Sequence, residues 1–382
     1  MELERKVDLI NGKDDLENIF TIKKFPVFMG CMDDDSDKND LFEDFIMDIS
    51  KSTGVVQVRK LIELSTLYDS EHSSGTVGKI WHDHHKAFAD FIFNNCSPSK
   101  VFEIGGLHGI LSKYYQESKH DMSWKILEPN PIPVEDCPAN FVEGFFDDKF
   151  IDNEEYDAYV HSHLFEHIYD PISFSKKLSD FIPEGKDLIF TVPNIKEMMI
   201  RKYTNALNFE HTFLLNHELV LYLMESNGFS LQSYKKFKED HSVFYHFKKS
   251  NKINNDLNKL ENKYEENIEI LNEWYHHHLS DAVKILEDIA KANPSSNVYM
   301  FGAHIFSQTL LKFGLNAEKI TAILDNDSAK QGKRLYGTNL KVASPEILKG
   351  EDSPVVILRA GVYNEEIKNQ IINEINSSTT FI

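Results

Sequence analysis

The chain has 382 residues, too many for one ordinary hydrophobic core, and this length predicts two or three domains. Its hydrophobic content of 41% and charged content of 27% are those of a soluble globular protein. The formal net charge of −20 argues against a nucleic-acid partner, because nucleic-acid binding needs a basic face. No apolar run reaches the ~20 residues that span a bilayer, and the N-terminus lacks an apolar signal core, so we expect a cytoplasmic protein without a membrane partner.

The predicted elements, in chain order, begin with short strands at 25–30 and 54–58 and a helix at 81–94, where apolar residues recur at helical spacing. Strands and helices then alternate up to residue 248. The predicted strands of this region lie at 101–104, 124–127, 156–160, 188–192, 231–238 and 242–247. The alternation predicts an α/β fold with a mainly parallel sheet that ends in an antiparallel strand pair.

The remainder of the chain predicts a helical linker at 250–293 and a second, smaller α/β unit at 294–382. Residues 1–80 then form an N-terminal unit and residues 81–249 the main α/β domain. Two glycine turns, at Gly105 and Gly302, each follow a strand, which favours two Rossmann-like domains over a solenoid repeat.

The stretch Val101-Phe-Glu-Ile-Gly-Gly-Leu-His-Gly109 predicts a strand that enters a glycine-rich cofactor loop. Gly105, Gly106 and Gly109 leave the backbone bare there, and Glu103 precedes them. The pattern E-x-G-G-x-H-G departs from the G-x-G-x-x-G of dehydrogenases and resembles motif I of class I S-adenosylmethionine (SAM) methyltransferases. An ordinary glycine-rich turn is the alternative.

Further cofactor contacts are expected along the same domain. Glu128 ends the second predicted strand about twenty residues after the glycines, where a carboxylate meets ribose hydroxyls. Phe145 and Phe146 follow Gly144 at the position that closes over the adenine, with plain core packing as an equal alternative. We also place His163 among the cofactor-binding residues.

Histidines are frequent, at 82, 84 and 85, at 161, 163 and 167, and at 276–278. No Cys, His or Asp set with zinc-site spacing joins them in the sequence, so we expect no metal. The first and last groups are expected on helix surfaces.

The segment Asn208-Phe-Glu-His211 follows the fifth predicted strand, where a methyl acceptor would have to be activated. Histidine has a pKa near operating pH, so His211 is the candidate base, and Glu210 is expected to fix its tautomer. A structural loop pair is the alternative. Arg201 and Lys333 are candidate contacts of an anionic substrate, with solvated surface as the alternative.

Together these motifs resemble the three-domain sugar C-methyltransferases, over nearly the whole chain. Glu166, His167, Asp170 and Pro171 match the x-E-H-x-x-D-P motif that follows a strand in this family, and Gly302-Ala303, Ile323–Asp327 and Lys330–Thr338 match its C-terminal domain. The resemblance implies a class I methyltransferase domain that binds SAM, a nucleotide-sugar substrate and a Glu-His base region at Glu210 and His211. It also places Tyr68, His72 and Asn208 beside the sugar.

The departures concern the N-terminal domain and two tyrosines. Where the family has two zinc-binding Cys-x-x-Cys-Gly pairs, this chain has Asp8-Leu-Ile-Asn-Gly12 and Ser50-Lys-Ser-Thr-Gly54. We therefore expect no zinc and a domain held by packing alone. Asn208 and His72 stand where the family has tyrosines that handle a keto sugar. C-methylation of a keto sugar is slightly favoured; O-methylation, a non-catalytic SAM-fold binding protein, and assembly into a homo-oligomer stay open.

Overall fold

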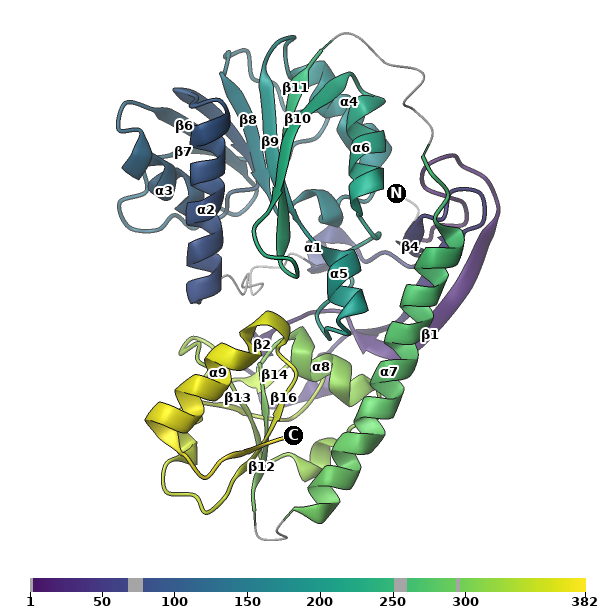
Figure 1. Cartoon of the computed structure of the whole chain (residues 1–382), viewed down its shortest axis with the longest axis vertical. Coiled ribbons are helices and arrows are strands. Elements are labelled where there is room, and N and C mark those ends of the chain that lie inside the picture. Colours follow the sequence, from purple (N-terminus) through teal and green to yellow (C-terminus); the bar gives the residue numbers. More distant parts are fainter. Residues whose placement is uncertain (1–2, 68–77, 251–259, 293–295) are drawn as a thin grey trace.

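The computed structural model describes residues 3–67, 78–250, 260–292 and 296–382 (Figure 1). Its strands form sheets of three, seven and five strands and one further two-stranded pairing. None of the described helices is both long and apolar enough to cross a membrane.

The seven-stranded sheet has the order β10-β11-β9-β8-β5-β6-β7. Its strands are β5 (Lys100–Ile104), β6 (Ser123–Glu128), β7 (Asn140–Glu143), β8 (Ala158–Ser162), β9 (Asp187–Pro193), β10 (Phe229–Lys236) and β11 (Ser242–Lys249). Neighbours from β5 to β9 pair in parallel, whereas β11 runs antiparallel to both β9 and β10. The parallel strands with an antiparallel closing pair form the sheet that the sequence predicts, so the predicted α/β fold class is confirmed.

Helices cover both faces of this sheet (Figure 1). The helices α2 (Lys79–Asn95) and α3 (Ile110–Ser118) pack on one face, and α4 (Pro171–Phe181) and α6 (His217–Glu225) pack on the other. The start of α4 is fixed locally, because Asp170 accepts a hydrogen bond from the Ser173 amide and Pro171 occupies the first turn. In the sheet β5 lies between β6 and β8, and the chain crosses back from β7 to β8, so the strand order reverses there and the cofactor crevice is expected at the carboxyl ends of β5 and β8.

The N-terminal unit is a three-stranded antiparallel sheet ordered β1-β3-β4. The unit contains the three strands of this sheet, β1 (Leu16–Pro26), β3 (Phe42–Ser50) and β4 (Val56–Val58). It also contains the separate strand β2 (Cys31–Met32) and the short helix α1 (Leu64–Leu67). Strand β3 was absent from the predicted elements, because its acidic positions obscure the alternation of apolar residues. The buried ring of Phe20 stacks on Trp274 and Tyr275 of the long helix α7 (Tyr264–Lys291), at centroid distances of 6.0 and 4.9 Å.

The two Gly-ending turns of this unit meet in a hydrogen-bonded group. Thr53 Oγ1 donates to Asp8 Oδ2 at 2.7 Å, the Ile10 amide donates to the other Asp8 oxygen, and Asn11 Nδ2 donates to Ser52 Oγ at 2.8 Å. Gly12 and Gly54 both adopt φ of +70°. The expectation that packing alone holds this domain is therefore wrong, because polar side chains at the expected thiol positions bond to one another or to adjacent groups.

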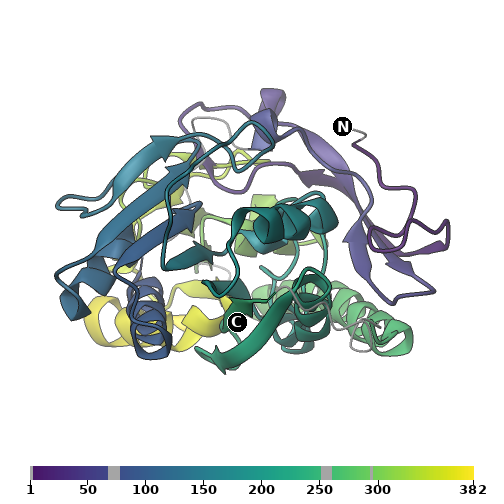
Figure 2. The ribbon, with the colours of Figure 1, turned by 90° about the horizontal axis from the view of Figure 1, so that it is seen from above.

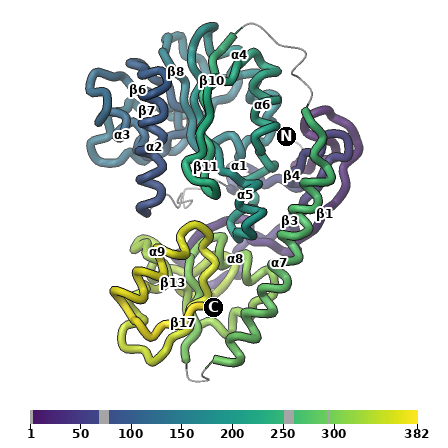
Figure 3. The backbone as a smooth tube through the Cα atoms, in the orientation of Figure 1, coloured from purple at the N-terminus to yellow at the C-terminus, as the bar shows by residue number. Residues whose placement is uncertain are grey.

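The C-terminal unit is a five-stranded parallel sheet ordered β15-β13-β12-β16-β17. Its elements are β12 (Val298–Phe301), α8 (Ile305–Lys312), β13 (Ala322–Leu324), β14 (Arg334–Leu335), β15 (Val342–Ala343), β16 (Val355–Leu358), α9 (Asn364–Gln370) and β17 (Thr380–Phe381). Helix α7 runs from the side of the N-terminal sheet to this unit (Figures 1 and 3). Figure 2 shows the molecule from above, with the N-terminal strands along one side.

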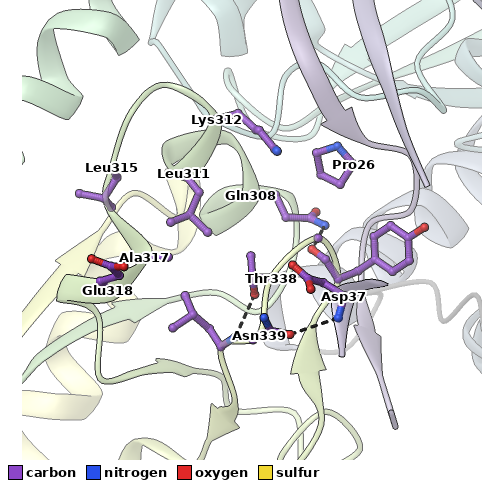
Figure 4. Close-up of a pocket in the computed structure, with 13 residues that line it drawn as sticks. Pro26, Asp37, Gln308, Leu311, Lys312, Leu315, Ala317, Glu318, Thr338 and Asn339 are labelled. Carbon is purple, nitrogen blue, oxygen red and sulfur yellow. Dashed lines mark hydrogen bonds between the residues drawn. The ribbon is translucent and has the colours of Figure 1, made fainter. Parts of the chain in front are cut away.

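Strand β2 of the N-terminal unit pairs with β14 of the C-terminal unit. Beside this pairing the fully buried Arg334 donates to both oxygens of Asp40, at 2.6 and 2.7 Å, and to Asp34 at 2.6 Å. A cavity of about 430 Å³ lies at the same junction (Figure 4), where the Asp37 amide donates to Asn339 Oδ1 at 3.1 Å. The acidic loop of residues 33–40 thus joins two units of the chain.

Candidate active site

A cleft of about 1690 Å³ opens at the carboxyl ends of β5, β6 and β8. Residues of all three units line it, including Met29 of the N-terminal unit and Lys330 of the C-terminal unit. The position agrees with the crevice expected of a doubly wound sheet. A cleft of this size has room for a nucleoside cofactor together with a second ligand.

The glycine loop after β5 forms one wall of the cleft. A Cβ at Gly106 would come within 2.8 Å of both Glu103 Cδ and Ile126 Cγ2, so only glycine fits there. Gly109 has φ of +67°, and a Cβ there would lie 2.3 Å from Cys137 Sγ. Close packing thus requires glycine at both positions; Gly105 and Gly106 line the cleft, whereas Gly109 is not among the described residues that line it.

Two carboxyl groups flank this loop. Glu128, at the end of β6, accepts hydrogen bonds from the amides of Leu107 and Asn130, at 3.2 and 3.1 Å, and lines the cleft. These bonds aim the carboxylate where ribose hydroxyls would lie. Burial raises the pKa of Glu103 to about 7, although Trp124 donates a 2.7 Å hydrogen bond to it. Glu103 therefore lies beneath the loop and supports it.

The two phenylalanines expected over the adenine have different surroundings. Phe145 is 56% exposed and lines the cleft. Phe146 packs against Phe150, Phe174 and Phe181, with centroid distances of 5.3 to 6.2 Å, and belongs to the core of that face. Both rings line the cleft, with Phe145 the more exposed and Phe146 partly buried against the core, so the cofactor role expected of each stays a prediction.

His163 lies just after β8 at the switch point, with φ of +48°, and lines the cleft. Its ring is 5.0 Å from Trp81 and 5.2 Å from His84, between ring centroids. His84 is fully buried, and His278 on α7 is only 1% exposed. The expectation that these histidines lie on helix surfaces is therefore wrong at both positions. Both sit on the inner, core-facing sides of their helices.

The loop that carries the candidate base is held by its own sequence. Asn208 Oδ1 accepts hydrogen bonds from the amides of Glu210 and His211, at 2.8 and 2.9 Å. Phe209 is buried against Phe45, with the ring centroids 5.1 Å apart. Glu210 and His211 both line the cleft. The side-chain oxygen of Asn208 shapes this loop, and Asn208 also lines the cleft, so its expected contact with substrate stays a prediction.

Four side chains gather below this loop: Glu166, His167, Glu210 and His211, which we call the Glu/His cluster. His167 lies 3.6 Å from Glu166 and 3.4 Å from Glu210, between nitrogen and oxygen atoms. Burial raises the pKa of Glu166, and burial together with Glu166 raises the pKa of Glu210 to about 8. Burial lowers the pKa of His211, which the charge of Glu166 opposes.

The tautomer of His211 is set by the backbone. His211 Nδ1 lies 3.2 Å from the Ala206 carbonyl oxygen, so this nitrogen carries the proton and Nε2 keeps a free electron pair. Glu210 was expected to fix the tautomer; it contacts His167 instead. The motif in the sequence contains Glu166 and His167, but their place beside His211 depends on contacts between distant parts of the chain.

The remaining predicted substrate contacts lie elsewhere. Arg201 pairs with Glu197 at 2.7 Å and with Asp240 at 3.5 Å, and it is not among the described residues that line the cleft. Lys333 pairs with Asp33 at 3.2 Å beside the junction of the N-terminal and C-terminal units, and it is also not among the described residues that line the cleft. Tyr68 and His72 lie outside the described residues.

A family model described as the C-methyltransferase C-terminal domain matches residues 245–382. Similar solved structures include human N-acetylserotonin methyltransferase in complex with SAM, at 14% identity over 44% of this chain and 52% of that one, with a TM-score of 0.35. An O-methyltransferase family protein from Burkholderia thailandensis has 8% identity over 46% and 57%, with a TM-score of 0.37. Mitomycin 7-O-methyltransferase has 13% identity over 44% and 53%, also with 0.37.

The overlap thus spans about half the length of each of these three proteins. No curated protein sequence matches the chain. The chain thus combines a doubly wound seven-stranded sheet with a segment, residues 245–382, that is similar to a C-methyltransferase C-terminal domain.

Proposed function

We propose that the protein transfers the methyl group of SAM to a carbon atom of a nucleotide-linked keto sugar. The observation that carries the proposal is that the bare glycine loop and the Nε2 side of a backbone-fixed His211 belong to one cleft. The match to a C-methyltransferase C-terminal domain favours carbon as the acceptor. The sugar class rests on the resemblance of the motifs to sugar C-methyltransferases.

The cofactor would be held by Glu128 at its ribose, by Phe145 at its adenine and by the glycine loop along its length. When bound, SAM supplies an electrophilic methyl group. The residues of this chain then have to orient the acceptor and to remove a proton from it.

His211 is proposed as the base. Its Nε2 takes the proton from the carbon beside the keto group, and the carbon that loses the proton becomes the nucleophile that attacks the methyl group. Glu166 stabilises the imidazolium that forms, since its charge opposes the lowered pKa of His211. Glu210 has a pKa of about 8 and is protonated at neutral pH, so it can donate a hydrogen bond within the cleft.

The nucleotide portion would lie against the C-terminal unit. Phe306 and Tyr363 both line the cleft there, with ring centroids 6.2 Å apart, and offer faces for a base. Lys330 and Asp325 line the same side, and their charged groups lie 3.4 Å apart. Lys330 would contact a diphosphate, and Asp325 would accept hydrogen bonds from ribose hydroxyls. These residues replace Arg201 and Lys333 as the proposed substrate contacts.

O-methylation of a sugar stays a second candidate because Asn208 stands where the family has a tyrosine. The two are separated by an assay with SAM labelled in its methyl group and a panel of nucleotide-linked sugars, both 4-keto and reduced, analysed by mass spectrometry. Methyl gain on the keto sugars alone supports the proposal. Gain only on reduced sugars makes the enzyme an O-methyltransferase, and no gain on either contradicts both.

A further inference from the structure

His84, His163 and His241 meet at the wall of the cleft although they lie far apart in the sequence. His84 comes from α2, His163 from the end of β8, and His241 from the turn before β11. One nitrogen of each ring lies within 4.8 Å of one nitrogen of the other two. His163 and His241 line the cleft.

We propose that these three histidines form a binding site for a divalent transition-metal ion of the zinc type. This inference goes beyond the proposed methyl transfer and does not depend on it. Three imidazoles are a ligand set of open zinc sites, which leaves a position for an oxygen of water or of a ligand in the cleft.

The three rings are chemically prepared for coordination. Metal binding needs the neutral imidazole. Burial lowers the pKa of His163 and of His241 to about 3, and it lowers the pKa of His84 as well. Burial thus disfavours the protonated form of each ring, which is the form that cannot bind a metal ion.

Hydroxyl groups of Ser242 and Thr191 lie beside the three rings. Ser242 Oγ lies 2.5 Å from His241 Nδ1 and 3.0 Å from His163 Nε2, and Thr191 Oγ1 lies 3.3 Å from His84 Nε2. The other nitrogen of the fully buried His84, Nδ1, has no hydrogen-bond partner within the described part of the chain. A buried nitrogen of this kind is rare unless it has a ligand.

The surrounding charge also fits a cation. Glu166 Oε1 lies 3.3 Å from His163 Nδ1, and neither oxygen of this fully buried carboxyl has a hydrogen-bond partner among the residues that the structure describes. An ion on the histidines would stabilise the ionised form of Glu166 one ring away. The buried carboxyl of Glu166 thus favours a cation bound to the histidines at this wall of the cleft.

Two other groups of possible ligands are weaker candidates. In the first, Cys96 has its pKa raised to about 12 by burial, and His246 already bonds to Asp187 at 2.8 Å. The second consists of Glu166, His167 and His211, which belong to the Glu/His cluster of the proposed base. Only the group of His84 consists, within the described ranges, of three imidazoles.

The test uses the full-length protein without an affinity tag, loaded with Zn²⁺, freed of excess metal and analysed by mass spectrometry for bound zinc. We expect about one ion per chain, and a loss of at least about tenfold in zinc affinity for His241→Gln. His276→Gln on the exposed side of α7 is the matched control and should keep the ion.

Loading the wild-type protein with Co²⁺ provides a second measurement that needs no variant. A three-histidine site with a fourth oxygen ligand gives the intense visible absorption of four-coordinate Co²⁺. Zinc content near zero and absence of this absorption would overturn the proposal. An ion that survives His241→Gln but is lost in Glu166→Gln or in His276→Gln would also overturn it, because the ion would then lie elsewhere.

Discussion

Thr53 donates a 2.7 Å hydrogen bond to the buried carboxylate of Asp8, and this contact joins the two glycine turns of the N-terminal unit. Both residues stand where the resembling family has zinc-binding cysteines. The turns keep their shape, since Gly12 and Gly54 both have φ of +70°. A hydrogen bond between side chains thus links the two turns.

Replacing Asp8 by Ala leaves the Thr53 hydroxyl and the Ile10 amide without their acceptor. We expect the free energy of unfolding to fall by about 1–3 kcal/mol, the cost of unsatisfied buried donors. Denaturant unfolding measures this change. Asn11→Ala removes an exposed hydrogen bond of the same turns and should change stability by less than about 0.5 kcal/mol. Equal effects of the two substitutions would contradict this account.

Arg334 makes a second buried contact, which joins the C-terminal unit to Asp40 of the N-terminal unit. Arg334→Met leaves Asp40, which is 2% exposed, with an uncompensated charge, so we expect a loss of about 3–5 kcal/mol. Lys341 pairs with Asp35 at the same junction but both are exposed, and Lys341→Met should cost at most about 1 kcal/mol. Thermal unfolding of both variants checks the difference, and similar melting temperatures would refute the role of burial.

Gly106→Ala tests the cofactor loop. The added Cβ would meet Glu103 and Ile126 at 2.8 Å, so the loop must move and SAM affinity should fall by roughly 10- to 100-fold. Isothermal titration calorimetry with the demethylated product, S-adenosylhomocysteine, measures it. Gly314→Ala, at φ of +115° with open space around it, is a control that loses stability but keeps affinity. Unchanged affinity in Gly106→Ala would place the cofactor elsewhere.

Substitution of Phe145 should mainly affect SAM binding, whereas substitution of Phe146 should mainly affect stability. Phe145→Ala removes an exposed ring and should raise the KM for SAM with little change in melting temperature. Phe146→Ala removes a ring packed among three others and should destabilise the protein by up to about 3–5 kcal/mol. The reverse pattern would show that Phe146 holds the adenine.

The pKa of Glu210 predicts how stability changes with pH. Its folded pKa of about 8 lies above the ordinary 4.5, so the folded state binds more protons than the unfolded state between these values. Stability therefore decreases as pH rises from 4.5 to 8, by up to about 1.4 kcal/mol per pH unit from this group. Glu210→Gln should weaken this decline in denaturant unfolding. A slope identical to wild type would mean that Glu210 is ionised throughout.

Much of the fold could be predicted because the signals are local. The alternation of apolar strands with helices indicated the doubly wound sheet, and the glycine loop marked the end of β5. What could not be predicted depends on contacts between distant segments. The Ala206 carbonyl on His211, the meeting of His84 with His241, and the pairing of Lys333 with Asp33 have no sequence spacing of their own. Burial of His84 also depends on which face of α2 meets the sheet.

Hydrogen exchange at the substrate carbon tests the central claim most directly. A 4-keto nucleotide-linked sugar is incubated in D₂O with the protein and S-adenosylhomocysteine, and NMR follows deuterium at the carbon beside the keto group. The account predicts exchange by the wild-type protein and a rate at least about 100-fold lower for His211→Gln, since the base is lost. Absence of exchange with the wild-type protein, or an equal rate in the variant, would contradict C-methylation with His211 as the base.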